Sequence, residues 1–438
     1  MEDFKKLFPH TKIITGIDLT RPTFVDGSYK YLTVLEGQFY DYAFCIYTQL
    51  KTMTCLSSTF IHHICYICDL AVDQIIKSYL EFENGEVIKG IKRLEGFIKK
   101  YKECFIVKLG LSYAVKCNNF FYNPNKIEND LLLFRSRKMG SLGPFVKRED
   151  MFHIPLEKSE YASSERYSTA GIPCLYLAIN SYVAMKEVNS NDEREVYVSS
   201  FKPQQDMLNK SIIDLTNIDP LAFISSREKY GINGIHEMKP KDIKKYLNML
   251  PAHFLSIACS IKMINETRPF KREYVIPNLI MYSLRDLRCV GVAYHSCIIS
   301  QYIHIMDSCF AFPALKENVC DENTTSPLRK LFKLSLGVNW FYFSKKRKEV
   351  LAANNRDPKQ TSVFLSDKLI GPSSWFQTLY PHEQWASYEE NQEYYKTTYF
   401  AFDQFLPNTA KFFYCTKKER IKNFDDYAEK NLEYKLKL

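Results

Sequence analysis

The chain has 438 residues, which is enough for two or three domains with a sizeable core. Its 46% apolar residues, 25% charged residues and only 15 Gly exclude intrinsic disorder as the main state, and they exclude collagen-like or Gly-rich low-complexity architectures. The net charge of +9 is a mild excess without a dense basic block, so we do not expect a nucleic-acid partner, whereas a small anionic substrate fits.

Cysteine usage and hydropathy indicate the compartment. The N-terminal segment has no pattern typical of a signal peptide, and no apolar run reaches the roughly 18 residues of a membrane span. The 13 Cys are odd in number and scattered along the chain, unlike a disulfide framework. We therefore expect a cytoplasmic protein without membrane contact, in which most thiols are buried.

Residues 1–125 are predicted to form a helical N-terminal region. Residues 60–80 are apolar enough for one helix, and Asn84-Gly85 separates it from a second. The second helix carries one apolar stripe at offsets of three or four residues, formed by Val87, Ile91, Leu94, Ile98 and Tyr101.

A cluster of Cys and His in the first of these helices raises the question of a metal. Cys65 and Cys68 have the spacing of half a zinc knuckle, and His62 lies one turn away, with Cys55 and His63 nearby. No second CxxC follows at the usual distance. We therefore predict an ordinary packed helical face, with structural zinc as the alternative.

Residues 126–325 alternate short strands with helices, which predicts an α+β fold. The clearest strands are short and rich in β-branched or aromatic residues, and they span 174–178, 194–201, 211–215 and 289–296. Residues 326–438 form an aromatic-rich C-terminal extension that ends in a mixed Lys/Glu tail, predicted to be a solvated helix. The aromatic stretch around Trp375, Phe376 and Trp385 is expected to pack over the core.

Polar residues in this middle region are spaced as if to line a cleft. Arg166 precedes a Gly-Ile-Pro turn and the strand that carries Tyr176, after which Asn180-Ser181 can cap a short helix with Glu187 in its last turn. About 100 residues later, another predicted strand ends at Ser296. Each residue alone has an ordinary explanation, such as a surface charge, a core aromatic or a strand end. Composition and periodicity alone therefore support no more than an α+β protein with a mixed sheet.

Several segments in order resemble the RES domain, which is named for an Arg, a Glu and a Ser. They are FRSR (134–137), the stretch 151–188 with its RYS-x-x-G-x-P-x-LYL…E pattern, IIDLT (212–216), IACSI (257–261), FKREYVIPN (270–278) and GVAYHS (291–296). The resemblance covers roughly residues 130–315. Two departures are Asn278, where a Gln is expected after the Pro, and Met185-Lys186, where members often have bulkier residues.

The resemblance implies a fold similar to that of the ADP-ribosylating toxins, with a cleft for NAD+. RES proteins are toxins of toxin–antitoxin pairs that destroy NAD+ by hydrolysis or phosphorolysis, so inorganic phosphate is a candidate co-substrate. Glu187 would stabilise the oxocarbenium-like transition state, Arg166 would bind a phosphate, and Ser296 would orient the nicotinamide ribose or amide. Tyr176 would cover the nicotinamide, and Arg135 would be a second phosphate contact.

Alternatives remain open at this point. Arg137 could take the place of Arg135 as the second phosphate contact. The same site could transfer ADP-ribose to a macromolecule, or the chain could be an inactive module that binds NAD+ or docks a partner. An antitoxin or regulatory protein is an expected partner, and the chain could form a homo-oligomer.

Overall fold

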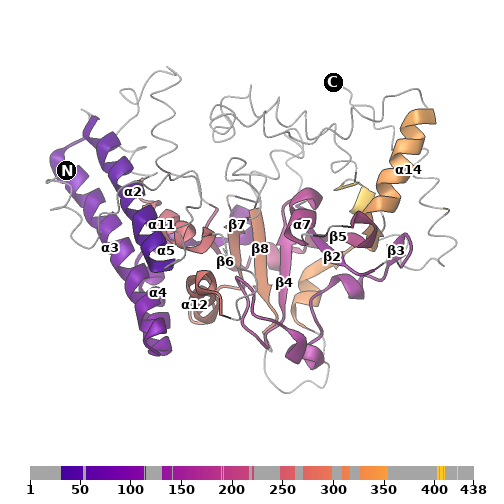
Figure 1. Ribbon diagram of the computed structural model, residues 1–438, viewed down its shortest axis with the longest axis horizontal. Helices are drawn as coiled ribbons and strands as arrows, with labels where there is room; N and C mark the ends of the chain where they lie inside the picture. The colour runs from indigo at the N-terminus through magenta and orange to yellow at the C-terminus, as the bar shows by residue number, and fades with distance from the viewer. Residues whose placement is uncertain are drawn as a thin grey trace. The chain divides into compact units, whose positions relative to one another are not determined.

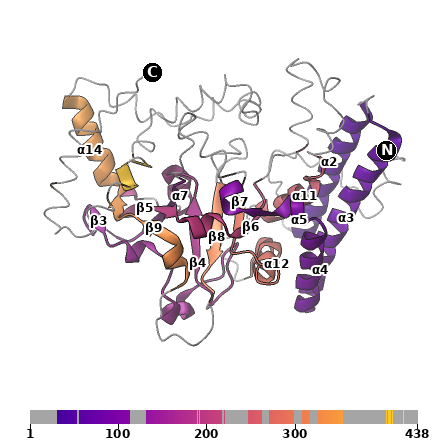
Figure 2. The ribbon, with the colours of Figure 1, turned by 180° about the vertical axis from the view of Figure 1, so that it is seen from behind.

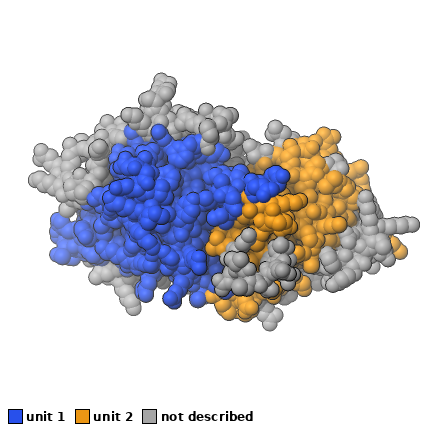
Figure 3. Space-filling model, turned by 90° about the horizontal axis from the view of Figure 1, so that it is seen from below, with its two compact units in different colours: residues 1–113, 160–172, 210–297 blue, residues 114–159, 173–209, 298–438 orange. Residues whose placement is uncertain are grey.

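The structure is a computed structural model. It describes residues 31–52, 56–112, 131–140, 142–188, 192–216, 247–261, 270–297, 308–315 and 326–353, with a few single residues elsewhere. The predictions for Trp375, Phe376, Trp385 and the Lys/Glu tail lie outside the described residues. The chain forms two compact units, coloured separately in Figure 3. Unit 1 comprises residues 1–113, 160–172 and 210–297, and unit 2 comprises residues 114–159, 173–209 and 298–438.

Unit 1 contains three long helices that pack side by side (Figures 1 and 2). They are α2 (Tyr31–Thr52), α3 (Ser58–Glu83) and α4 (Val87–Lys100). The Ser57 side chain caps α3 by accepting a hydrogen bond from the Phe60 amide at 3.2 Å. Gly85 follows the end of α3 with a φ of +81°, a conformation that glycine adopts without strain. The two predicted helices and the break between them are thus confirmed.

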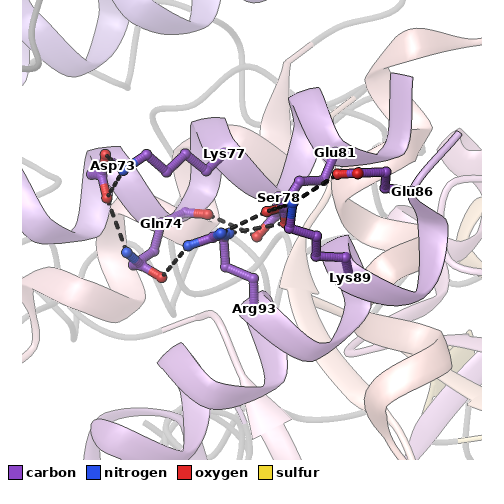
Figure 4. Close-up of polar contacts among 8 residues, drawn as sticks. All are labelled: Asp73, Gln74, Lys77, Ser78, Glu81, Glu86, Lys89 and Arg93. Carbon is purple, nitrogen blue, oxygen red and sulfur yellow. Dashed lines mark hydrogen bonds and ion pairs between the residues drawn. The ribbon is translucent and has the colours of Figure 1, made fainter. Parts of the chain in front are cut away.

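Helices α3 and α4 are joined by a polar network (Figure 4). Arg93 of α4 binds both carboxylate oxygens of Glu81 on α3, at 2.9 and 2.6 Å, while Lys89 pairs with the exposed Glu86 at 2.9 Å. Gly90 allows the two helices to approach closely, because a Cβ there would lie 2.8 Å from a backbone oxygen of α3. The network and the glycine together fix how α4 packs on α3.

The rest of unit 1 adds short helices and a small sheet. The helices are α5 (Lys102–Phe105), η1 (Leu109–Leu111), α11 (Leu250–Ser260), η6 (Arg272–Tyr274) and α12 (Val275–Ser283). Strand β6 (Ser211–Asp214) pairs antiparallel with β1 (Ile106–Lys108) and parallel with β7 (Val292–His295). Tyr31 links three helices, since its hydroxyl donates to the Ala258 carbonyl of α11 and its ring lies 4.9 Å from that of Tyr79 on α3.

Unit 2 is built on an antiparallel sheet in the order β8-β4-β2-β5-β10-β3, with β9 paired to the end of β5. Its strands are β2 (Leu133–Lys138), β3 (Phe145–Val146), β4 (Cys174–Ala178), β5 (Val196–Pro203), β8 (Ser308–Pro313), β9 (Phe332–Leu334) and β10 (Gly337–Asn339). Its α-helices are α7 (Ser181–Val188), α8 (Gln205–Leu208), α13 (Leu328–Leu331) and α14 (Trp340–Ala353). Unit 2 also contains the short 3-10 helices η2 (Glu149–Met151) and η4 (Glu193–Glu195). A third, η3 (Leu156–Tyr161), begins in unit 2 and ends in unit 1, because the division between the units falls after residue 159.

The four predicted strands are present as β4, β5, β6 and β7, and the strand at 174–178 matches the prediction at both ends. Helices and sheets occur in both units, so the mixed composition expected of an α+β chain is confirmed. None of the helices among the described residues is long and apolar enough to cross a membrane.

Candidate functional site

Arg166 lies in unit 1, in a tight turn closed by a pair of backbone hydrogen bonds between Glu165 and Ser168. Its Nη1 donates to the carbonyl of Cys259 at 2.8 Å, and its guanidinium carbon lies 5.2 Å from the ring centre of Tyr274. Cys259 is in the last turn of α11, where helix carbonyls lack intrahelical donors and attract cations. The carbonyl and the ring fix the orientation of Arg166. Both are neutral, so they do not compensate its positive charge.

Ser296 follows β7 in the same unit and is buried. The strand is anchored by Tyr294, whose ring centre lies 4.2 Å from that of Tyr167, the residue after Arg166. The Sγ of Cys297 lies 3.9 Å from the Cys259 carbonyl, the same oxygen that Arg166 binds. The structure therefore brings Arg166 and the end of β7 together around one carbonyl.

Glu187 and Tyr176 lie in unit 2, on the strand–helix segment formed by β4 and α7. Asn180 caps α7 by accepting a hydrogen bond from the Val183 amide at 2.8 Å, and Asp403 accepts one from the Ser181 amide at 3.2 Å. The capped helix packs against β2 and β4 and carries half-buried Glu187 in its last turn. This local arrangement is the one that the sequence predicts.

Arg135 lies on β2 in unit 2, and its guanidinium is an unusual buried cation. Its Nε and Nη1 are buried and make no hydrogen bond with any described residue. Burial, together with the charge of Arg137, lowers the pKa of Arg135 to about 10, and nearby Cys174 and Tyr176 partly oppose this shift. Buried charges are normally paired, so Arg135 is a candidate contact for an anionic ligand.

Arg137, the alternative phosphate contact, has a structural role. Its Nη1 donates to the carbonyls of Asp150 at 2.5 Å and Phe152 at 3.3 Å. These bonds hold the 150–152 segment against β2. The sequence leaves open which of the two arginines contacts a phosphate, and the structural role of Arg137 makes Arg135 the better candidate.

His153 is a residue that sequence reasoning missed. It is only 4% exposed, its Nδ1 lies 2.7 Å from the Ile154 carbonyl, and its buried Nε2 has no hydrogen-bond partner in the described part of the chain. Burial and the charge of Arg135 lower its pKa. A single His in an Ile-Pro loop gives no sequence signal of this environment.

The Cys and His cluster of α3 does not converge on one point among the residues described. Cys65 and Cys68 lie on the buried face, where burial raises the pKa of Cys65 to about 12, while His62 is exposed and contacts the Ser58 carbonyl of its own helix. Cys55 lies outside the described residues. Across the ranges that the structure describes, no group of three or more His, Cys, Asp or Glu side chains is placed to hold a metal ion.

Unit 2 also has a cavity of about 250 Å³, whose lining contains none of the predicted site residues. Its lining combines basic and aromatic side chains, and consists of Arg148, Glu149, Phe152, Gln204, Arg329, Phe332, Lys333 and Leu334. Glu149 accepts from Arg148 at 3.1 Å and from Arg329 at 2.9 Å, so two of the cations are already paired.

Comparison with known proteins finds a distant relative. The chain is 26% identical over 228 residues to the "Putative toxin YopC" of Bacillus subtilis (strain 168), and the match covers 51% of this chain. The chain thus spans about half the length of that relative, 49% of which is aligned. No protein-family model matches the chain, and no solved structure matches it.

Proposed function

We propose that this chain is a RES-type enzyme that cleaves the nicotinamide N-glycosidic bond of NAD+, and that it acts as a toxin. The observation that carries the proposal is the β4–α7 segment, which bears Tyr176 on the strand and Glu187 on a capped helix, beside the strand with the unpaired cation Arg135. The ordered RES-like motifs support it from the sequence, and the relative named as a toxin supports the biological role.

The chemistry requires a carboxylate and oriented cations. Cleavage of the N-glycosidic bond passes through an oxocarbenium-like transition state, and a carboxylate near the ribose stabilises this charge more than it stabilises the ground state. Glu187 takes this role. Arg166 is held by a carbonyl and an aromatic ring, so its charge is available to a substrate phosphate.

The remaining residues orient the substrate. Ser296 donates a hydrogen bond to the nicotinamide ribose or amide, and the Tyr176 ring covers the nicotinamide. Arg135 supplies positive charge for a phosphate. An antitoxin or regulatory protein would restrain the activity in the cell.

The test is nicotinamide release from NAD+ by the purified full-length chain, with and without inorganic phosphate. Glu187→Gln removes the charge with little change of shape, so release should fall about 100-fold or more. Glu157→Gln removes an exposed carboxylate of the same unit and should leave release unchanged. Expression of the wild type should arrest growth, and expression of Glu187→Gln should not.

Other outcomes assign other functions. Transfer of labelled ADP-ribose to a protein, with little free ADP-ribose formed, would make the chain a transferase. Binding of NAD+ without cleavage would make it a sensor or docking module. Equal release by the wild type and Glu187→Gln would refute the role of Glu187, and absence of both binding and release would refute the proposal.

A further inference from the structure

Strand β9 lies at an edge of the sheet of unit 2. Among the described strands it pairs with β5 alone, in the register Lys202↔Lys333 (Figure 2). An edge strand presents backbone N–H and C=O groups that its own sheet does not use, and these groups can pair with an added strand. The direction in which they point decides whether β9 can accept one.

Two hydrogen bonds that flank β9 fix this direction. The Gln204 amide donates to the Leu331 carbonyl at 2.9 Å. The Ser335 amide donates to the Ser200 carbonyl at 3.0 Å. Hydrogen-bonded and non-bonded residue pairs alternate along an antiparallel ladder, so the first and third residues of β9 are the non-bonded ones. Their N–H and C=O groups therefore point away from β5, towards an edge where no described strand pairs with them.

The cavity of about 250 Å³ lies along this same edge. Its lining includes all three residues of β9, namely Phe332, Lys333 and Leu334. Lys333 is exposed on one face of the sheet, whereas the side chains of Phe332 and Leu334 are buried on the other face. A cavity that contacts residues of both faces lies at the edge of the strand, and β5 already occupies the other edge. A ligand in the cavity therefore meets the outward-pointing backbone groups of β9.

The rest of the lining gives this cavity an apolar base and a basic rim. Phe152, like the two buried residues of β9, is no more than 8% exposed. The charged residues are Arg148, Arg329, Lys333 and Glu149. Glu149 contacts both arginines through one oxygen, Oε1, and Lys333 forms no ion pair with any described residue. Three cations surround one carboxylate, so the rim attracts negative charge.

We propose that the edge of β9 and the adjoining cavity bind an extended acidic segment of a partner protein, which adds to the sheet as an antiparallel strand. All strand pairs of unit 2 are antiparallel, and the added strand continues this pattern. Segment residues opposite the first and third residues of β9 exchange backbone hydrogen bonds with them, and their apolar side chains enter the cavity beside Phe152. The acidic side chains alternate with these and lie on the face of Lys333.

The proposal goes beyond the proposed function, because an acidic segment can bind to unit 2 whether or not the chain cleaves NAD+. The two can therefore fail independently. The alternation of acidic and apolar residues also defines the probe, a fluorescein-labelled peptide of sequence Glu-Val-Glu-Val-Glu-Val. Its binding to the full-length chain is measured by fluorescence anisotropy at constant ionic strength, and unlabelled peptides then compete with it.

Methylated peptides test the backbone hydrogen bonds. N-methylation of the Val amides should weaken competition at least about tenfold, because these are the N–H groups that bond to β9. N-methylation of the Glu amides should change competition less than about twofold, because these N–H groups point away from β9. The same peptide with Lys in place of Glu should compete at least about tenfold less well. No binding of the probe, or equal losses from the two methylated peptides, would overturn the proposal.

Two variants with the same change of charge test the place of binding. Lys333→Glu should weaken binding of the probe about fivefold or more, whereas Lys348→Glu, at an exposed position of α14 outside the cavity lining, should leave it unchanged. Equal effects would show attraction to the overall charge and contradict the site. A dimer of the full-length chain that Lys333→Glu dissociates would assign the edge to a second copy and overturn the proposal. Nicotinamide release by the same preparations shows separately whether the proposed function holds.

Discussion

Replacing Arg135 with Met is expected to stabilise the protein while removing its anion binding. Burial and the neighbouring Arg137 lower the pKa of Arg135 from 12.5 to about 10, which corresponds to a cost of about 3 kcal/mol for keeping this charge in the fold. Met preserves most of the buried aliphatic stem. Because Nε and Nη1 bond to no described residue, little hydrogen bonding is lost there. The free energy of unfolding should therefore rise by about 1–3 kcal/mol.

Arg137→Met is the matched control, two residues along the same strand. Its guanidinium donates to two backbone carbonyls, at 2.5 and 3.3 Å, and Met would leave both carbonyls without this donor. Hydrogen bonds from charged donors contribute more than neutral ones, so this variant should lose about 2–3 kcal/mol. The same type of substitution thus has opposite expected signs at the two positions.

Urea unfolding followed by far-UV circular dichroism measures both effects. The unfolding midpoint should rise for Arg135→Met and fall for Arg137→Met, with similar m values. If the midpoint of Arg135→Met falls as far as that of Arg137→Met, Arg135 has a structural partner and the reasoning is wrong. Added phosphate should raise the midpoint of the wild type but not that of Arg135→Met.

Three further predictions concern unit 1. Hydrogen bonds from Arg93 lower the pKa of Glu81, so the stabilisation by this ion pair is present above about pH 4.5 and is lost as the pH falls. Arg93→Met should lower the free energy of unfolding by about 1–3 kcal/mol at pH 7 and by progressively less towards pH 3. A difference that does not change with pH would refute the ion pair. Gly90→Ala should lower the thermal midpoint, because the added Cβ would lie 2.8 Å from a backbone oxygen of α3. Gly96→Ala is the control: a Cβ there would have no atom within 4 Å, so this variant should stabilise α4 by about 1 kcal/mol. Equal effects of the two variants would show that the helices are not in close contact at Gly90. EDTA should leave the melting temperature unchanged, because no group of three or more His, Cys, Asp or Glu side chains in the described ranges is placed to hold a metal ion, and a large decrease would revive the zinc alternative.

Local patterns account for the elements that were predicted well. The strand at 174–178 is bounded by Pro173 and by the Asn180 cap of α7, so both its ends are encoded within a few residues. The apolar stripe of α4 and the Asn84-Gly85 break define the α3–α4 hairpin in the same way. In each case the residues that determine where the element begins and ends lie within a few positions of those ends.

Pairings between distant segments could not be predicted in this way. Strand β4 pairs with β8, more than 130 residues later, in the register Cys174↔Pro313. The environment of His153 depends on Phe152 packing against Phe201 of β5, a contact for which the loop sequence gives no signal. Periodicity describes which face of an element is apolar, but it does not say which element covers that face.

The arginines illustrate why a candidate site needs structure as well as motif. Arg93 is paired with a carboxylate, Arg137 donates to two carbonyls, and Arg166 is oriented by a carbonyl and an aromatic ring. Arg135 differs because its buried donors have no partner among the residues described. In the sequence, FRSR presents Arg135 and Arg137 as equivalent. The difference between them arises from the backbone carbonyls that the 150–152 segment supplies to one and not to the other. Arg135 is therefore expected to add little to stability, and its buried donors are the ones that a ligand could satisfy.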